Sequence, residues 1–182
     1  LFRLVKKRGK HLSFMAHINH PQEMKTKEFE EAVCKILETG ATIRTQSPLI
    51  RRINDSSEIW SDMWKKQVKL GMIPYYMFVE RDTGPKHFFE LPLSQALKIY
   101  QEAIRNVSGL ARTARGPSMS AYPGKVCVDG VVNVHGKKVF VLSLLQARSP
   151  ELVKRPFFAE YDGDAKWLTD LRPAFADRFP FE

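Results

Sequence analysis

The sequence is poor in cysteine and has no long apolar run. Its 182 residues include two cysteines, Cys34 and Cys127, which lie far apart and have no further ligands at metal-site spacing. This pattern excludes a disulfide framework and is typical of a reducing compartment, so we expect a cytoplasmic protein. Cys34 is expected on the apolar side of a helix. Because no 18-residue apolar run and no signal peptide occur, neither a membrane partner nor export is expected.

Acidic residues are outnumbered by basic ones. The 29 lysines and arginines against 20 aspartates and glutamates give a formal net charge of +9, while 43% hydrophobic residues is ordinary for a globular chain. Such a surplus fits an anionic substrate, a phosphate-bearing cofactor, a nucleic acid, or solubility alone. Since the basic residues are spread along the chain, we read no clear nucleic-acid footprint.

Strand-like and helix-like segments alternate over the first 107 residues. Hydrophobic patterning predicts strands at 11–19, 41–45 and 73–79, each followed by an amphipathic helix, at 27–38, 55–71 and 93–107. Asp55 and Glu58 have the spacing of a capping box, so the second helix is expected to begin at Asp55. This order predicts an α/β fold with a parallel sheet.

The stretch 108–129 has neither helical nor strand periodicity, and we expect it to be a loop. It holds three glycines and two prolines, and Lys125 directly follows Pro123 and Gly124. Taken alone, such a lysine is usually a solvated surface residue. The alternative is an amine, held in a loop that can approach a phosphate, that forms a Schiff base.

Two features follow this stretch. Residues 125–134 and 138–145 predict a β-hairpin with its turn at 135–137. The segment 150–182 is rich in aromatic residues and is expected to pack over the core as an ordered extension.

In parallel α/β sheets, ligands bind beyond the carboxyl ends of the strands. Polar or charged residues therefore become candidates where they follow the predicted strands or lie in the 108–129 stretch; these are His17, Asn19, His20, Gln46, Ser47, Glu80, Arg81, Asp82, Arg112, Arg115, Ser118 and Lys125. Tyr75 and Tyr76 should point to opposite faces of their strand, so at most one of them lines a cavity. His17 fits a core histidine equally well.

Taken in order, several short motifs resemble the lysine 2,3-aminomutase family of radical S-adenosylmethionine enzymes. The resemblance covers about residues 11–128 and is carried by His17-Ile18-Asn19-His20-Pro21, Gln46-Ser47 with Leu49, Ile50, Arg51, Asn54 and Asp55, Pro74-Tyr75-Tyr76 with His87-Phe88, Ser108-Gly109, and Pro123-Gly124-Lys125.

This resemblance implies the C-terminal part of an incomplete (βα)6 TIM-like barrel with a β-hairpin and an aromatic-rich C-terminal extension. Residues 1–108 would form three βα units, and 109–182 the lysine loop, hairpin and extension. It also implies an isomerase that migrates an amino group between adjacent carbons of an amino acid. The implied cofactors are pyridoxal 5′-phosphate, S-adenosylmethionine and a [4Fe–4S] cluster.

The resemblance also assigns roles to individual residues. Lys125 corresponds to the catalytic lysine that binds pyridoxal phosphate as an imine. His17 and Gln46 correspond to the S-adenosylmethionine side of the cavity, and Tyr75 to its cavity-facing strand. Tyr75 and Asn19 are further cofactor-binding candidates.

The sequence departs from the family pattern in two ways. The CxxxCxxC loop that holds the cluster is absent, so we expect it upstream of Leu1. The start without methionine then indicates a piece of a longer chain. This piece is expected to be inactive alone and to contain no metal ligands. Of the two aspartates that hold a lysine substrate, one corresponds to Ser118 and the other to Arg81 or Asp82. We therefore take Asp82 and Ser118 as substrate-binding candidates, and the substrate need not be free lysine.

Two alternatives stay open. One is a pyridoxal-phosphate-binding protein without radical chemistry. The other is a basic module that acts on nucleic acid or on a translation factor, as the related elongation factor P lysine mutase acts on its factor. The partners expected under the leading interpretation are an amino acid and the missing N-terminal part of the polypeptide. Homo-oligomerisation stays open, and nucleic acid is not expected.

Overall fold

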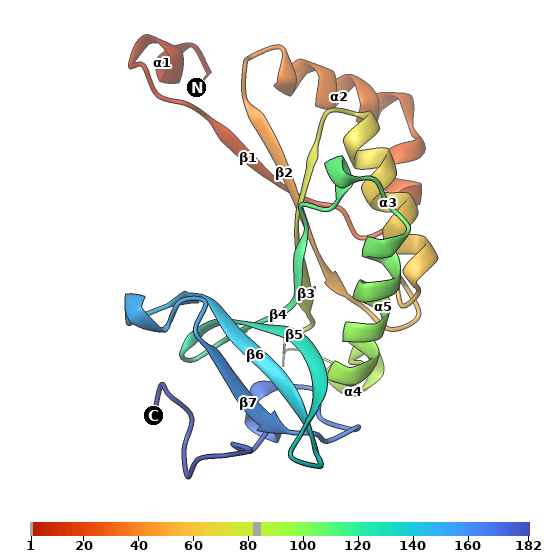
Figure 1. The fold of residues 1–182 in the computed structure, drawn as a ribbon. Coiled ribbons are helices and arrows are strands. Elements are labelled where there is room, and N and C mark those ends of the chain that lie inside the picture. Colours follow the sequence, from red (N-terminus) through yellow and green to blue (C-terminus); the bar gives the residue numbers. More distant parts are fainter. Residues whose placement is uncertain (1, 82–84) are drawn as a thin grey trace.

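A computed structural model describes residues 2–81 and 85–182, without the side chains of residues 2, 3, 6 and 86. A short N-terminal helix, α1 (Phe2–Lys7), precedes a mixed seven-stranded sheet whose strands lie side by side in chain order (Figure 1). Strands β1 (Ser13–His17), β2 (Thr42–Leu49), β3 (Ile73–Val79) and β4 (Arg115–Ala121) are parallel. Strands β5 (Gly124–Val134), β6 (Lys137–Ala147) and β7 (Pro156–Glu160) continue the sheet antiparallel.

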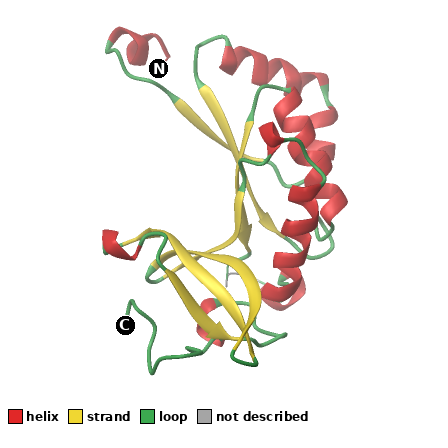
Figure 2. Ribbon diagram, in the orientation of Figure 1, coloured by secondary structure: helices red, strands yellow, loops and turns green. Residues whose placement is uncertain are grey.

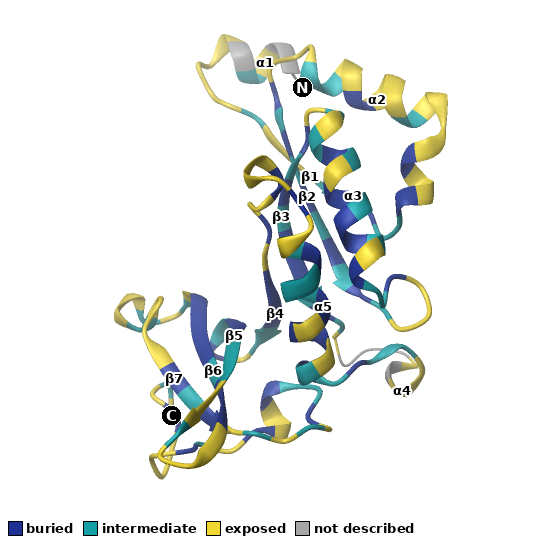
Figure 3. Ribbon diagram, turned by 45° about the vertical axis from the view of Figure 1, so that its right-hand side comes forward, coloured by how far each residue is buried: buried dark blue, intermediate teal, exposed yellow. Residues whose placement is uncertain are grey.

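The main helices cover one face of the parallel strands and leave the opposite face open (Figure 2). They are α2 (Lys27–Leu37), α3 (Ser57–Lys69) and α5 (Leu93–Arg105), with the single turn α4 (Lys86–Phe89) before α5. Trp60, Met63 and Trp64 of α3 are completely or almost completely buried against the sheet. Residues with buried side chains therefore alternate along β2 with half-buried ones that face the open side (Figure 3).

The C-terminal aromatic residues pack as predicted. Phe157 of β7 and Phe179 are buried in a second core cluster with Phe140, and the rings of Phe179 and Phe181 stack at 5.2 Å. The predicted hairpin is β5 and β6, with its turn at His135 and Gly136. The extension is thus an ordered part of the fold.

The α/β class and the three early strand–helix pairs are confirmed, but four details of the prediction are wrong. Strand β2 runs to Leu49 rather than ending at Thr45. The N-cap of α3 is Ser56, whose side chain accepts the Ile59 amide, and not Asp55. Cys34 is exposed because it lies beside, not within, the apolar stripe of α2 that Val33 and Leu37 share.

The fourth and largest error concerns the stretch 108–129, which contains strand β4 and the start of β5. Small residues fill β4 because it packs closely against β3: a Cβ on Gly116 would overlap the carbonyl oxygen of Met77. Such a strand lacks the β-branched residues by which strands are recognised.

The seven-stranded sheet is open, and it neither confirms nor excludes the incomplete barrel. The boundary at residue 108 stays a prediction. Within the described ranges, no helix has the length and apolarity to cross a membrane.

Candidate functional site

A cavity of about 630 Å³ lies where the parallel strands end at their carboxyl termini. We call it the strand-end cavity. Its lining comes from the ends of β1 to β4 and the start of β5, and consists of His17, Gln46, Pro48, Ile50, Phe78, Val79, Glu80, Arg81, Ser120 and Lys125. Five of the predicted candidates thus meet in one cavity although they come from distant parts of the sequence: His17, Gln46, Glu80, Arg81 and Lys125.

Lys125 is the amine of this cavity. It lies in β5 rather than in a loop, and its backbone is paired with Ser120 of β4 and Gln146 of β6. Its Nζ lies 3.9 Å from the ring centroid of Tyr76 and 4.8 Å from that of Phe78. Two aromatic rings and two neighbouring strands therefore hold the amine towards the cavity.

Burial lowers the pKa of Lys125 below the ordinary lysine value. The positive charges of Arg115 and Arg81 lower it further, while Tyr75 acts in the opposite direction. A lowered pKa raises the fraction of neutral amine, which is the nucleophilic form.

The reactivity of Lys125 towards aldehydes should reflect this shift. As the pH rises through the pKa, the amine loses its proton and becomes reactive, so the rise for Lys125 should occur at lower pH than for an unshifted lysine. The measurement is the pH dependence of reductive labelling, residue by residue, by mass spectrometry. A short acetylated lysine peptide, labelled in the same reaction, is the reference. Identical midpoints for Lys125 and the peptide lysine would contradict the assignment.

His17 and Gln46 form a polar pair in the same cavity as the amine. They are register partners on β1 and β2, and Gln46 Nε2 lies 2.5 Å from His17 Nε2. The two strands present these side chains on the open face, because residues at alternate positions share one face of a sheet. The pair offers hydrogen-bond donors and acceptors to a ligand in the cavity.

Asn19 does not line the strand-end cavity. Its Oδ1 accepts from Ser47 Oγ at 2.9 Å, and its carbonyl accepts from Asn54 Nδ2 at 2.9 Å. Asn54 is completely buried, donates also to Pro48 O and accepts from Ile50 N. This network holds together the segments that follow β1 and β2. Asn19 therefore helps to fix Pro48 and Ile50, which line the cavity, without lining it itself.

Replacing Asn54 with alanine should therefore destabilise the fold. The change leaves the half-buried carbonyls of Asn19 and Pro48 and the amide of Ile50 without their partner, at a cost of about 3 kcal/mol. Asn133→Ala, at an exposed position of β5, is the matched control and should change stability by less than about 0.5 kcal/mol. Denaturant unfolding of both variants measures the difference, and equal midpoints would contradict the role given to Asn54.

Tyr75 and Tyr76 lie on the same side of β3, so the expectation that they point to opposite faces is wrong. The register between β2 and β3 shifts here, because Thr45 pairs with Pro74 and Gln46 with Tyr76. Such a bulge brings two consecutive side chains together. Their ring centroids lie 4.3 Å apart, and the guanidinium of Arg115 lies within 6 Å of both.

Other predicted residues are placed less directly. Ser118 is completely buried and hydrogen-bonds weakly to Met77 O, and it does not line the cavity. Asp82 lies outside the described residues. Arg112 contacts carbonyls at the end of α5, far from the strand ends. Tyr75 contacts Arg44 and Arg115 on the open face.

Sequence reasoning missed Phe78 and Ser120. Phe78 is two residues after Tyr76 and so shares its face, a period-two signal that was present in the sequence. Ser120 could not be found, because its strand was not recognised.

Two polar atoms near Lys125 are buried without a hydrogen-bond partner among the described residues: Tyr76 Oη and Glu80 Oε2. Burial raises the pKa of Tyr76, and burial followed by the charge of Glu90 raises the pKa of Glu80. Buried polar groups in folded proteins nearly always have a hydrogen-bond partner, from the protein or from ordered water. Both atoms are therefore candidates for a contact with a water molecule or a ligand.

The residues fit two of the three cofactors that the family resemblance implies. A lysine with a lowered pKa beside two rings and an unpartnered tyrosine hydroxyl suits an aromatic aldehyde such as pyridoxal phosphate. The hydrogen-bonded pair His17 and Gln46 suits the polar edges of S-adenosylmethionine. The cluster does not fit, because it needs several thiolates and the two cysteines lie apart, Cys34 exposed on α2 and Cys127 buried in β5.

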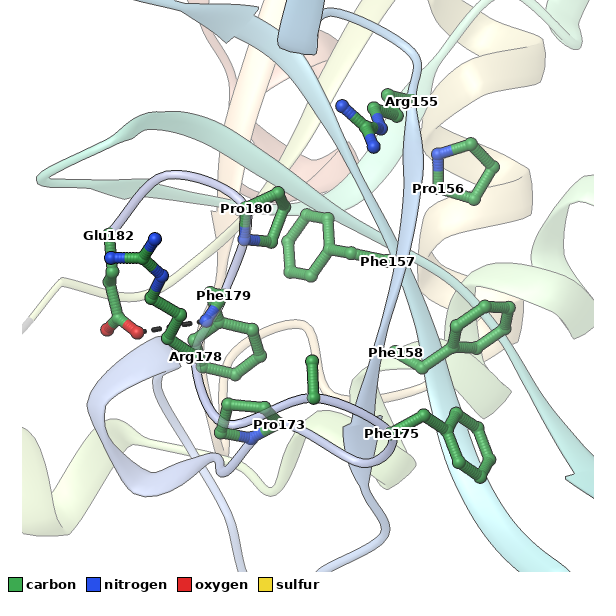
Figure 4. Close-up of a pocket in the computed structure, with 11 residues that line it drawn as sticks. Arg155, Pro156, Phe157, Phe158, Pro173, Phe175, Arg178, Phe179, Pro180 and Glu182 are labelled. Carbon is green, nitrogen blue, oxygen red and sulfur yellow. Dashed lines mark hydrogen bonds between the residues drawn. The ribbon is translucent and has the colours of Figure 1, made fainter.

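Two other hollows of the described residues bear on the site or lie in the C-terminal extension. A cavity of about 350 Å³, here called the basic cavity, adjoins the first and is lined by Arg81, Ser120, Ala121, Gly124, Lys125, Gln146, Ala147 and Arg148. A groove of about 540 Å³ separates β7 from the C-terminal segment (Figure 4), where Phe157, Phe158, Phe175 and Phe179 gather. The groove holds none of the predicted site residues.

Several curated lysine 2,3-aminomutases are similar to this chain. A protein of Aquifex aeolicus provisionally named an L-lysine 2,3-aminomutase is 30% identical over 93% of the chain and 44% of its own length. The L-lysine 2,3-aminomutases of Escherichia coli and Clostridium subterminale are 29% and 31% identical over 62% and 51% of the chain, and 33% and 22% of their own lengths. The chain thus spans less than half of these relatives. No protein-family model matches it.

Proposed function

Since the chain is similar to lysine 2,3-aminomutases along most of its length, we propose that it forms the pyridoxal-phosphate and substrate side of a radical S-adenosylmethionine aminomutase. Such an isomerase would migrate an amino group between adjacent carbons of an amino acid. Ligands for an iron–sulfur cluster would have to come from outside this chain, from an N-terminal part of the same polypeptide.

The observation that carries the proposal is that Lys125 shares its cavity with His17 and Gln46. Pyridoxal phosphate, when bound, supplies an aldehyde and an electron-withdrawing ring. The Lys125 amine would hold this aldehyde, and the rings of Tyr76 and Phe78 keep the amine in place and exclude water from one side. The Tyr76 hydroxyl lies behind the amine, because Tyr76 is buried and does not line the cavity.

His17 and Gln46 would contact S-adenosylmethionine at the opposite side of the cavity. Side chains of this kind orient a ligand by hydrogen bonds. Glu80 lines the same cavity and would contact the substrate.

Gln46→Ala should weaken S-adenosylmethionine binding roughly tenfold while leaving pyridoxal phosphate binding unchanged, because it removes one side chain from the His17 side of the cavity. Calorimetry of both ligands with the purified, anaerobically handled protein measures the difference. Gln101→Ala, on the half-buried surface of α5 away from the cavity, is the control. Wild-type affinity for S-adenosylmethionine in Gln46→Ala would remove Gln46 from the site.

The activity itself is tested by anaerobic assay of the reconstituted protein against lysine, glutamate and other amino acids, with detection of the β-amino product. A pyridoxal-phosphate protein without radical chemistry would bind the cofactor at Lys125 but form no such product. We retain this second function because the described residues do not fit a cluster.

A further inference from the structure

The basic cavity adjoins the proposed cofactor site. It shares Arg81, Ser120 and Lys125 with the strand-end cavity, so that Lys125 stands at the junction of the two. A ligand attached to the Lys125 amine can therefore extend into either space. At about 350 Å³, the basic cavity has room for one small group.

Strand pairing accounts for the side chains that meet there. Lys125 is paired with Ser120 on one side and Gln146 on the other, and paired residues of antiparallel strands project from the same face. Arg148 follows Gln146 by two positions and so shares that face. Arg81 reaches the cavity from the segment directly after β3.

The charges in this cavity have one sign. Among the described residues that line it, every charged side chain is cationic: Arg81, Lys125 and Arg148. Gln146 and Ser120 add neutral donors. Guanidinium groups match the geometry of carboxylates and phosphates, and the two arginines that line the cavity would repel a ligand's ammonium group.

We propose that the basic cavity binds the oxyanion, a phosphate or a carboxylate, of the molecule that reacts at Lys125. This inference rests on the proposed function and deepens it, because it names the charge of the group held beside the reacting amine. Two sources carry this chemistry: the phosphate of the cofactor and the side-chain carboxylate of an acidic amino acid. A substrate with a distal ammonium is disfavoured in this cavity.

The test uses Arg81→Gln and Arg148→Gln in the purified protein, with Arg155→Gln as the control. Arg155 is exposed and lines the C-terminal groove, so its replacement removes the same charge elsewhere. One arm compares the affinities of pyridoxal phosphate and of pyridoxal, which lacks the phosphate. The other compares glutamate with glutamine, by calorimetry on the protein loaded with pyridoxal phosphate.

In at least one of the two arms, Arg81→Gln and Arg148→Gln should bind the anionic probe roughly tenfold more weakly than the wild-type protein. Their affinity for the neutral probe, and the affinity of Arg155→Gln for both probes, should be unchanged. Loss of pyridoxal phosphate but not pyridoxal identifies the phosphate as the source; loss of glutamate but not glutamine identifies the carboxylate. Wild-type affinity for all probes, or equal loss of charged and neutral probes, overturns the inference while leaving Lys125 as the cofactor lysine. Failure of the wild-type protein to bind pyridoxal phosphate at Lys125 overturns the proposed function as well.

Discussion

Lys125→Ala is expected to abolish covalent binding of pyridoxal phosphate. The Lys125 amine is the nucleophile that lines the strand-end cavity, and burial with two nearby guanidinium groups keeps its pKa below the ordinary value. Labelling after borohydride reduction should fall to background, and the visible absorbance of the bound cofactor should disappear. Because the side chain is only half-buried, the free energy of unfolding should change by less than about 1 kcal/mol.

Lys138→Ala is the matched control for this variant. Lys138 also contacts an aromatic ring, that of Tyr161, but it lies on β6 outside the strand-end cavity. Its replacement should leave labelling and absorbance unchanged. If Lys125→Ala keeps the absorbance, another residue binds the cofactor and the proposed function loses its main support.

Gly124→Ala should destabilise the fold about as much as Asn54→Ala. Gly124 opens β5 with φ of 143°, a conformation that disfavours side chains, and a Cβ there would overlap the carbonyl oxygen of Gln146. Strain and displacement of β6 together should cost about 3 kcal/mol, which corresponds to a fall in Tm of roughly 10 °C for a chain of this size. Cofactor binding should weaken too, because Lys125 is the next residue.

Gly130→Ala provides the comparison within the same strand. A Cβ at Gly130 would have nothing within 4 Å, and its φ is not positive. Thermal unfolding of the two variants should differ by most of the predicted 10 °C fall. Equal melting temperatures would show that the backbone of β6 at Gln146 leaves room for a Cβ at Gly124.

The residues at the carboxyl ends of the parallel strands could be predicted from the sequence. His17 and Gln46 follow directly from hydrophobic segments, so their placement at one sheet edge needed only strand order. Lys125 was singled out for its residue type and for its place after Pro123 and Gly124, and the structure brings it to the same cavity. The conformation predicted for Lys125, a loop, is nevertheless wrong, because Lys125 lies in strand β5.

What could not be predicted depends on contacts between strands. β4 is stabilised by close packing against β3 rather than by intrinsic preference, so its small residues gave no strand signal and Ser120 stayed hidden. The shared side of Tyr75 and Tyr76 depends on a register shift that only the pairing with β2 reveals. Arg148 lines the same cavity as Lys125 because β5 and β6 pair Lys125 with Gln146, and this register is not visible in the sequence.

The most direct test of the central claim is to locate the cofactor on the chain. The purified protein is incubated with pyridoxal phosphate, reduced with borohydride, digested and mapped by mass spectrometry. The account predicts that the phosphopyridoxyl group is found on the peptide that contains Lys125. Modification of a different lysine, with Lys125 unlabelled, would contradict it.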